Sequence, residues 1–341
     1  MMISTTKFFI GIDVSKPYFD ASLMAVVNHL KQPVETARFD NNATGIKSFD
    51  KWLKNHRVTF DEQSLVVIEN TGIYHRLIWS FCSRKHLPIH IGNAAHIKWS
   101  FGIARGKNDK IDSLRLCNYA YRESDTLTAI APLSPVLLHL KDFISARTKL
   151  LKQITSLGVS IKELGNVNEK AHQKLIERSL RSAIDGIAKS ISNIETEIKK
   201  IIEENKAFKS NYRLLLSIPG IGHVTAVYLI GCTANFAGSP SGKQLACYAG
   251  VAPFEHSSGI SIKGKTRVHR MANKELKRLL HLCALSAIQH NLEIKNYYNR
   301  KKDEGKHGMS ILNAVRNKIV LRVAAVVKNQ IPFKNNHKIA A

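Results

Sequence analysis

The order of strand-like and helix-like segments in the first 130 residues constrains the fold most. Three apolar or alternating runs predict strands in a meander, at residues 7–13, 19–27 and 34–40. A helical pattern then begins at Asn42, a buried strand spans Leu65 to Glu69, and helix and strand alternate up to a helix over residues 109–121. This order predicts an α/β domain over residues 1–130 and matches the order of elements in ribonuclease-H-like folds.

Four carboxylates lie at the ends of these predicted elements. Asp13 ends the first strand, Glu69 ends the fourth, and Asp109 and Asp112 lie three residues apart on one face of a helix. An acid at the end of a buried strand is costly unless something compensates its charge, and Mg²⁺ is held by carboxylate oxygens from several elements. Each acid alone is compatible with a cap or a surface residue. Together they predict a metal site suited to phosphodiester chemistry.

The charge of the chain limits its partners. A formal net charge of +25 favours polyanions, and the basic residues are spread along the chain rather than gathered in a tail. Nucleic acid is therefore the expected partner, and a membrane-surface binder is the alternative. We expect no membrane span, because no apolar run approaches the roughly 20 residues that crossing a bilayer requires. The five cysteines form no metal-ligand spacing, which favours a reducing cytoplasmic, nucleoid-associated location without zinc or disulfides.

Residues 131–210 form a predicted helical region after a proline-containing linker. Its second segment has apolar residues at alternating steps of four and three, the spacing of a coiled-coil seam: Leu180, Ile184, Ile187, Ile191, Ile194, Ile198 and Ile201. The first segment, from Leu137 to Leu164, keeps a weaker version of the spacing. A helical hairpin and a coiled coil between subunits both fit this pattern.

Residues 211–341 form a predicted compact, mainly helical domain that ends in a basic helix over residues 310–328. The stretch 214–230 reads as helix, tight turn and helix, with Gly220 and Gly222 in the turn. Such glycines let backbone N–H groups approach a phosphate closely, as in a helix-hairpin-helix DNA contact. An ordinary corner between two helices, which mainly packs the domain together, is the alternative.

A polar loop with several serines is expected over residues 250–264, followed by basic residues. A loop serine is usually solvated or caps a helix, and the sequence shows no His/Asp pair that would activate one. The residues alone therefore do not identify a nucleophile.

The acidic segments resemble a known family. IGIDVSK, IENTGIYH and GKNDKIDSLRL are similar to the three acidic motifs of the DEDD insertion-sequence transposases, which include the Piv and MooV invertases and the bridge-RNA-guided recombinases. The resemblance runs through nearly the whole chain. It implies a RuvC-like domain, similar to Holliday-junction resolvases, in which Asp13, Glu69, Asp109 and Asp112 bind Mg²⁺.

The same resemblance extends to the serine segment. The frame Ser-Gly-x-Ser resembles the family's C-terminal signature and implies that Ser258 is the catalytic serine, with Ser257 a neighbouring hydroxyl. Ser258 would attack a DNA phosphate and form a phosphoserine link, with the acids and their metal assisting. Basic residues would hold phosphates nearby: Lys263, Lys265, Arg267 and Arg270. The implied partners are donor and target DNA, a noncoding bridge RNA, and further copies of the chain in a dimer or tetramer.

Two other functions remain open at this point. A hydrolytic nuclease of the resolvase type would use the acids to activate water, with the C-terminal domain only binding DNA. A nucleic-acid-binding protein on a degenerate ribonuclease-H scaffold would use neither the acids nor the serine. Substitution of Asp13 and of Ser258 separates these alternatives from a serine recombinase.

Overall fold

The structure is a computed structural model, and it describes residues 6–70, 72–101, 109–130, 133–167, 169–258, 262–268 and 271–335. Within these ranges, the side chains of residues 109–110, 255–258 and 262–267 lie outside the description. The chain divides into two compact units, Met1–Pro132 and Leu133–Ala341, and each is described by itself.

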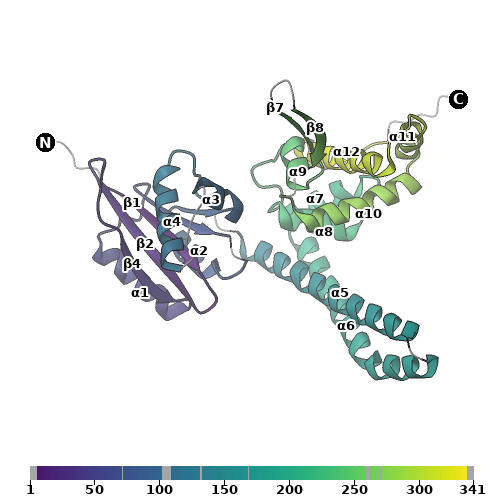
Figure 1. The fold of residues 1–341 in the computed structure, drawn as a ribbon, viewed down its shortest axis with the longest axis horizontal. Helices are drawn as coiled ribbons and strands as arrows, with labels where there is room; N and C mark the ends of the chain where they lie inside the picture. Colours follow the sequence, from purple (N-terminus) through teal and green to yellow (C-terminus); the bar gives the residue numbers. More distant parts are fainter. Residues whose placement is uncertain are drawn as a thin grey trace. The chain divides into compact units, whose positions relative to one another are not determined.

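The first unit is built on a mixed sheet (Figure 1). Its strands are β1 (Thr6–Val14), β2 (Tyr18–Val27), β3 (Leu30–Lys31), β4 (Glu35–Asp40), β5 (Ser64–Glu69) and β6 (Ile89–Gly92). β2 pairs antiparallel with β1 and with β4, whereas β5 runs parallel to β1 and to β6. The predicted meander followed by alternating strands and helices is confirmed, and the short β3 is an addition.

Helices cover both faces of this sheet. α1 (Ala43–Asn55) and α2 (Arg76–Arg84) share an aromatic cluster with the strands, in which Phe49 packs edge-on against Phe19 and Phe81. α4 (Asp109–Arg122) packs on the other face, where Leu116 and Cys117 join the core. α3 (Ala94–Ser100), which the sequence pattern did not predict, follows β6. Successive side chains of a strand point to opposite faces of the sheet, and helices cover the apolar side chains on both faces.

Gly11 is a point at which α4 approaches β1 closely. A Cβ atom at Gly11 would lie 2.0 Å from the backbone nitrogen of Cys117 and 2.3 Å from the carbonyl oxygen of Ser113. The hydroxyls of Ser113 and Ser22, which lies opposite Gly11 on β2, hydrogen-bond at 2.8 Å in the interior. Only glycine leaves room for this backbone contact. Gly11 therefore sets the position of α4 above the sheet.

The second unit begins with a long helical hairpin (Figure 1). α5 (Pro135–Val167) and α6 (Lys170–Glu204) pack against each other, and Arg147 of α5 donates hydrogen bonds to Glu195 of α6. Ile198 is buried and joins the core of the unit, whereas Leu180 and Ile184 farther along the predicted seam are half-buried. α5 thus supplies a partner helix for the seam within the same chain.

The rest of the second unit is mainly helical, as predicted. It contains α7 (Lys206–Leu216), α8 (His223–Cys232), α9 (Gly242–Tyr248), α10 (Lys274–His290), α11 (Leu292–Asp303) and α12 (Gly308–Asn329). α12 coincides with the predicted basic helix and buries Val315 and Ile319 against the core that it shares with Leu280 of α10. None of the helices in the described ranges is long and apolar enough to cross a membrane.

The expectation of a polar loop over residues 250–264 was wrong. β7 (Pro253–Ser258) and β8 (Ile262–Val268) form an antiparallel ribbon across this stretch. The ladder pairs backbone groups that a loop would leave to solvent, and the β-branched residues Ile262, Thr266 and Val268 favour a strand. The strand was not predicted because the serines of this stretch are typical of loops and turns.

Substitution of Gly11 by alanine tests the packing of α4 on β1. Because the new Cβ would meet backbone rather than a movable side chain, we expect the free energy of unfolding of the first unit to fall by roughly 1–3 kcal/mol. Urea unfolding followed by tryptophan fluorescence measures this unit alone, since Trp52, Trp79 and Trp99 all lie in it.

Gly92→Ala on β6 is the matched control. Its Cβ would meet the end of the Ile97 side chain at 2.6 Å, and that side chain can rotate away. We expect a smaller loss of stability than for Gly11→Ala. Equal losses in the two variants would contradict the role assigned to Gly11.

Candidate functional site

Two of the four predicted acids lie side by side at one edge of the sheet. The parallel register pairs Ile12 of β1 with Ile68 of β5, so Asp13 and Glu69 follow at neighbouring positions. Residues two positions earlier, Gly11 and Val67, face α4, and side chains alternate along a strand. Asp13 and Glu69 therefore lie on the α4 face, where the carboxyl ends of two adjacent strands meet. Both side chains are half-buried.

The direction of α4 brings its first turn to the same edge. Phe9 of β1 contacts Tyr121 near the end of α4, whereas Gly11 contacts Ser113 near its beginning. β1 and α4 therefore run in opposite directions. The end of β1, at Asp13, lies on the side of the N-terminal turn of α4, which contains Asp109 and Asp112. The fold places the four predicted positions at the ends of three elements that converge on one edge.

The surroundings of the acids on α4 decide how a metal ion would bind there. Asp112 accepts a hydrogen bond from Nη1 of Arg115 at 2.8 Å, whereas the side chain of Asp109 lies outside the described residues. Within the described part of the chain, no group of three His, Cys, Asp or Glu residues could hold a metal ion as placed. Carboxylate oxygens are nevertheless the donors that Mg²⁺ prefers. The oxygen donors and their positions on the elements are of the kind that such an ion needs, so the Mg²⁺ site stays a prediction, and an ion bound at Asp112 would compete with the contact from Arg115.

An ion pair that the sequence analysis missed continues the row of charges. Asp20 of β2 lies opposite Asp13, and Arg38 of β4 lies opposite Asp20. Nε and Nη2 of Arg38 donate to the two carboxylate oxygens of Asp20 at 3.0 and 2.8 Å, and the guanidinium stacks 3.8 Å from the Tyr18 ring centre. The Asp20 side chain is only 1% exposed, so its charge is balanced almost wholly by Arg38. The only sequence signal was an acid within an otherwise buried strand.

The predicted serine lies on the β7–β8 ribbon. Ser258 is the last residue of β7 and pairs with Ile262, and Ser257 pairs with Lys263. Lys265 and Arg267 also belong to β8, but the side chains of these ribbon residues lie outside the description, as does the whole of Arg270. The ribbon carries both the serines and most of the predicted basic residues on two adjacent strands.

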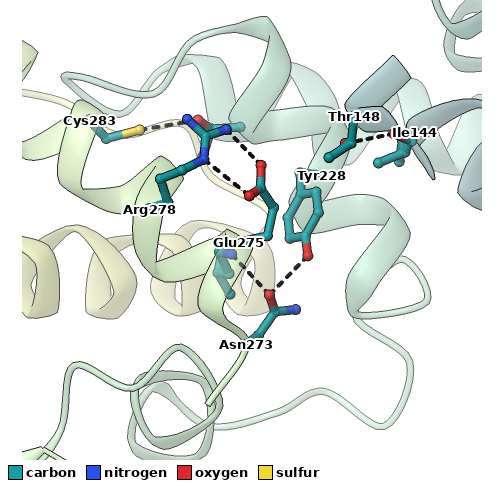
Figure 2. Close-up of polar contacts among 9 residues, drawn as sticks. Ile144, Thr148, Tyr228, Asn273, Glu275, Arg278 and Cys283 are labelled. Atoms are coloured by element: carbon teal, nitrogen blue, oxygen red, sulfur yellow. Dashed lines mark hydrogen bonds and ion pairs between the residues drawn. The ribbon is translucent and has the colours of Figure 1, made fainter. Parts of the chain in front are cut away.

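Asn273 fixes the end of the segment that returns from this ribbon (Figure 2). Its backbone N–H donates to the carbonyl of Tyr248, and its side chain donates to the Tyr248 hydroxyl at 2.9 Å. The Asn273 side-chain oxygen accepts from the Tyr228 hydroxyl at 2.9 Å and from the Leu276 N–H at the start of α10. Burial raises the pKa of Tyr228 to about 12, so this hydroxyl remains a donor at neutral pH. One side chain thus links α8, α9 and α10 at the base of the ribbon.

The two glycines of the predicted turn have different roles. The helix, turn and helix are present as α7 and α8. Gly220 has a φ of +89°, and a Cβ there would lie 2.3 Å from the carbonyl oxygen of Cys283, so this glycine packs the turn against α10. Gly222 is exposed, has open space around its Cβ position, and precedes α8 without a side-chain cap. Packing therefore accounts for Gly220, whereas the phosphate contact stays a prediction that the exposed Gly222 leaves room for.

His223, the first residue of α8, is half-buried and hydrogen-bonds the Tyr212 hydroxyl through Nδ1 at 2.8 Å. Burial lowers the pKa of His223, and the positive charges of Arg147 and Lys199 lower it further, while Glu195 opposes them. The imidazole is therefore neutral at physiological pH.

Two family models match separate parts of the chain. One, described as a transposase of the DEDD, IS110 type, matches residues 10–164, and the other, described as the Transposase IS116/IS110/IS902 family, matches residues 212–299. The first match contains all four acids and the second contains Gly220, Gly222 and the β7–β8 ribbon. The four acids and the serines of the ribbon thus all fall inside matched segments.

Whole proteins with related sequences agree with these matches. The pilin gene-inverting protein of Moraxella bovis is 27% identical over 336 residues, which cover 96% of this chain and 98% of that protein. Its namesake in Moraxella lacunata is 28% identical over 338 residues, with the same coverage of both chains. An uncharacterized 43.6 kDa protein of the insertion element IS110 from Streptomyces coelicolor is 30% identical over 146 residues, 42% of this chain and 35% of that protein.

Removal of the Arg38 charge tests its pairing with Asp20. Arg38→Leu leaves a buried carboxylate without its balancing charge, so we expect the free energy of unfolding of the first unit to fall by roughly 2–4 kcal/mol. The double variant Asp20→Val/Arg38→Leu removes both charges and should recover most of that loss. Urea unfolding followed by tryptophan fluorescence gives both values. Losses that simply add in the double variant would show that the two side chains are not coupled.

Acidification tests the half-buried His223. Its pKa is lower in the folded chain than the ordinary value of 6.5, so the unfolded chain binds the proton more readily and stability is lost as pH falls through that value. We expect His223→Gln to lose less stability than the wild type between about pH 7.5 and 5.5, measured by urea unfolding with circular dichroism at 222 nm.

His172→Gln, at an exposed position of α6, is the matched control and should retain the wild-type pH dependence. If His223→Gln and the wild type lost stability in parallel, His223 would not be the group responsible.

Proposed function

We propose that this chain, which belongs to the IS110-type family of insertion-sequence transposases, recombines DNA through a covalent link between Ser258 and a DNA phosphate. The observation that carries the proposal is the convergence of β1, β5 and the first turn of α4 on one edge. This convergence gathers four acid positions from elements distant in sequence. The +25 charge supports a nucleic-acid substrate.

Asp13, Glu69, Asp109 and Asp112 would hold the Mg²⁺ ions. When bound there, Mg²⁺ supplies Lewis-acid stabilisation of the charge that develops on phosphate oxygens. Asp13 and Glu69 lie on strands whose backbones are fixed by the ladder on both sides, which suits a site that must hold its geometry. We do not include the buried Asp20 in this donor set, since it already pairs with Arg38 through both of its oxygens.

Ser258 supplies the nucleophile in the proposed reaction. Its hydroxyl oxygen forms a bond to phosphorus as the bond from phosphorus to the 3′-oxygen of the DNA breaks, and the serine proton balances the proton gained by the released 3′-hydroxyl. A 3′-hydroxyl of another strand then attacks the phosphoserine, restoring the serine and joining the strands. One phosphodiester bond is exchanged for another, so the reaction needs no external energy source.

The two halves of the proposed site belong to different compact units, since the acids precede Pro132 and Ser258 follows Leu133. The reaction therefore requires the two units to act on the same DNA. We propose that further copies of the chain take part in a dimer or tetramer. The half-buried outer part of the seam, from Leu180 to Ile191, supports this, because packing on α5 leaves it partly accessible.

A structured noncoding RNA is proposed as the guide that selects donor and target DNA. The support is the resemblance to bridge-RNA-guided recombinases and the excess of basic residues along the chain. In such an arrangement the protein would contact the shape and backbone of the RNA, and base pairing would supply the sequence specificity.

A hydrolytic nuclease is the second candidate function. One observation favours it: all four acids lie in the first unit, so phosphodiester hydrolysis by metal-activated water would need no residue of the second unit. The two functions differ in what they require of Ser258.

A recombination assay with the native element ends and flanking noncoding sequence tests the proposal. We expect Asp13→Ala and Ser258→Ala each to lower recombination by roughly 1,000-fold or more, because each removes a group that acts directly on the reacting phosphate. Chelation of divalent cations should abolish recombination by the wild type.

Ser257→Ala is the matched control, a loss of one hydroxyl at the adjacent strand position, and should retain recombination. Cleavage that survives Ser258→Ala but not Asp13→Ala would indicate the hydrolytic nuclease. Activity that survives both substitutions would contradict catalysis at either position.

A further inference from the structure

A cleft in the second unit, whose described lining residues come from helices, has the features of a ligand site. It measures about 620 Å³ and lies between α5, the start of α8 and the start of α10. Figure 2 shows the Glu275–Arg278 pair of α10, with Tyr228 of α8 drawn between this pair and Thr148 of α5. The volume is within the range of pockets that bind small organic ligands.

The floor of the cleft is apolar. It is formed by aliphatic side chains from all of the surrounding helices: Ile144, Leu151, Ile198, Val224, Val227 and Leu279. Val227, Ile198 and Leu279 are almost fully buried and are held by the core, so the floor is a fixed surface. The Tyr228 ring adds an aromatic surface beside it. A planar apolar ring packs on such a surface more favourably than a strongly hydrated polar group does.

Cationic groups surround this floor. Arg147, Lys152 and Arg278 all line the cleft, and Glu275 is the one acidic residue among its described lining residues. Arg278 donates to Glu275 through Nε and Nη2 at 3.0 and 2.6 Å, and this pair lowers the pKa of Glu275. The Arg278 side chain is still 55% exposed, with its Nη1 edge turned away from Glu275. Lys152 lies exposed at the rim.

The start of α8 adds to the positive character of one side. His223 and Val224 line the cleft, and both belong to the first turn of α8 behind the exposed Gly222. The N–H groups of a first helical turn carry partial positive charge. A ligand with a flat ring and an attached anion matches these features. The ring would lie on the apolar floor, and the anion would meet the guanidinium of Arg278, the ammonium of Lys152 and the start of α8.

We propose that this cleft binds an unpaired nucleotide, with the base on the apolar floor and the phosphate at Lys152 and the outer edge of Arg278. The proposal rests on the proposed function, because strand exchange and a folded guide RNA both expose unpaired nucleotides. A duplex keeps its bases stacked inside, so only an unpaired nucleotide places a base on the floor. The shared chemistry is a nucleoside phosphate, which either DNA or RNA provides.

Site-specific photo-crosslinking identifies the occupant. A photoreactive phenylalanine analogue replaces Thr155, an exposed lining residue, and the full-length protein is irradiated with DNA or RNA hairpins that carry one unpaired bulge. We expect a crosslink at the bulge, and its presence in the DNA or the RNA arm identifies the source. The same analogue at Ser179, which is exposed on α6 outside the cleft, should give a crosslink yield at least tenfold lower.

A charge substitution measures the phosphate contact. Lys152→Gln should weaken binding of a single-stranded oligonucleotide about tenfold and reduce the slope of log affinity against log salt by about 0.7, the loss of one phosphate contact. Lys174→Gln, which removes the same charge at an exposed position of α6, should leave the slope unchanged. Equal effects of the two variants would overturn the proposal.

Three further outcomes separate a failure of the proposal from a failure of the proposed function. A crosslink from Thr155 to a second copy of the chain would assign the cleft to a protein contact. Absence of a nucleic-acid crosslink from a protein that still recombines DNA through Ser258 would leave the recombinase intact and the cleft without a nucleotide. A crosslink at the bulge in a protein that fails to recombine would support the cleft and contradict the recombinase.

Discussion

The backbone contact between Gly11 and α4 is the constraint on which the carboxylate edge depends. Because Gly11 has no Cβ, the carbonyl of Ser113 and the N–H of Cys117 approach β1 closely, and the helix lies directly on the sheet. This fixes which turn of α4 is level with the end of β1. The short separation allows acids on a helix and acids on strands to converge on one edge.

Charge around this edge is arranged in a row across the sheet. Arg38, Asp20, Asp13 and Glu69 occupy successive positions on β4, β2, β1 and β5, so an ion pair between the half-exposed Arg38 and the buried Asp20 flanks the acids assigned to metal binding. The second unit has a different organisation, in which Asn273 ties the base of the serine ribbon to three helices. The rigid acid edge and the anchored ribbon are the features of the two units that the proposed recombination would use.

Most helices and strands were predictable from the sequence, but the contacts between them were not. The positions of Asp13 and Glu69 at strand ends were predictable, because buried strands are readable as apolar runs. The Asp20–Arg38 pair was not, because pairing of β2 with β4 depends on a register that no local pattern encodes. The β7–β8 ribbon was missed for a different reason: its serines favour turns, and pairing between the two consecutive strands overrides that preference. The packing role of Gly220 likewise depends on α10, far along the chain.

Mapping of the covalent protein–DNA intermediate tests the central claim most directly. Wild-type protein is trapped on DNA in the presence of Mg²⁺, digested with protease and nuclease, and analysed by mass spectrometry for a peptide that carries a nucleotide. The account predicts a phosphodiester on Ser258, absent when Asp13 is replaced by alanine. A nucleotide on another residue, or recombination that proceeds without any DNA-linked peptide, would contradict it.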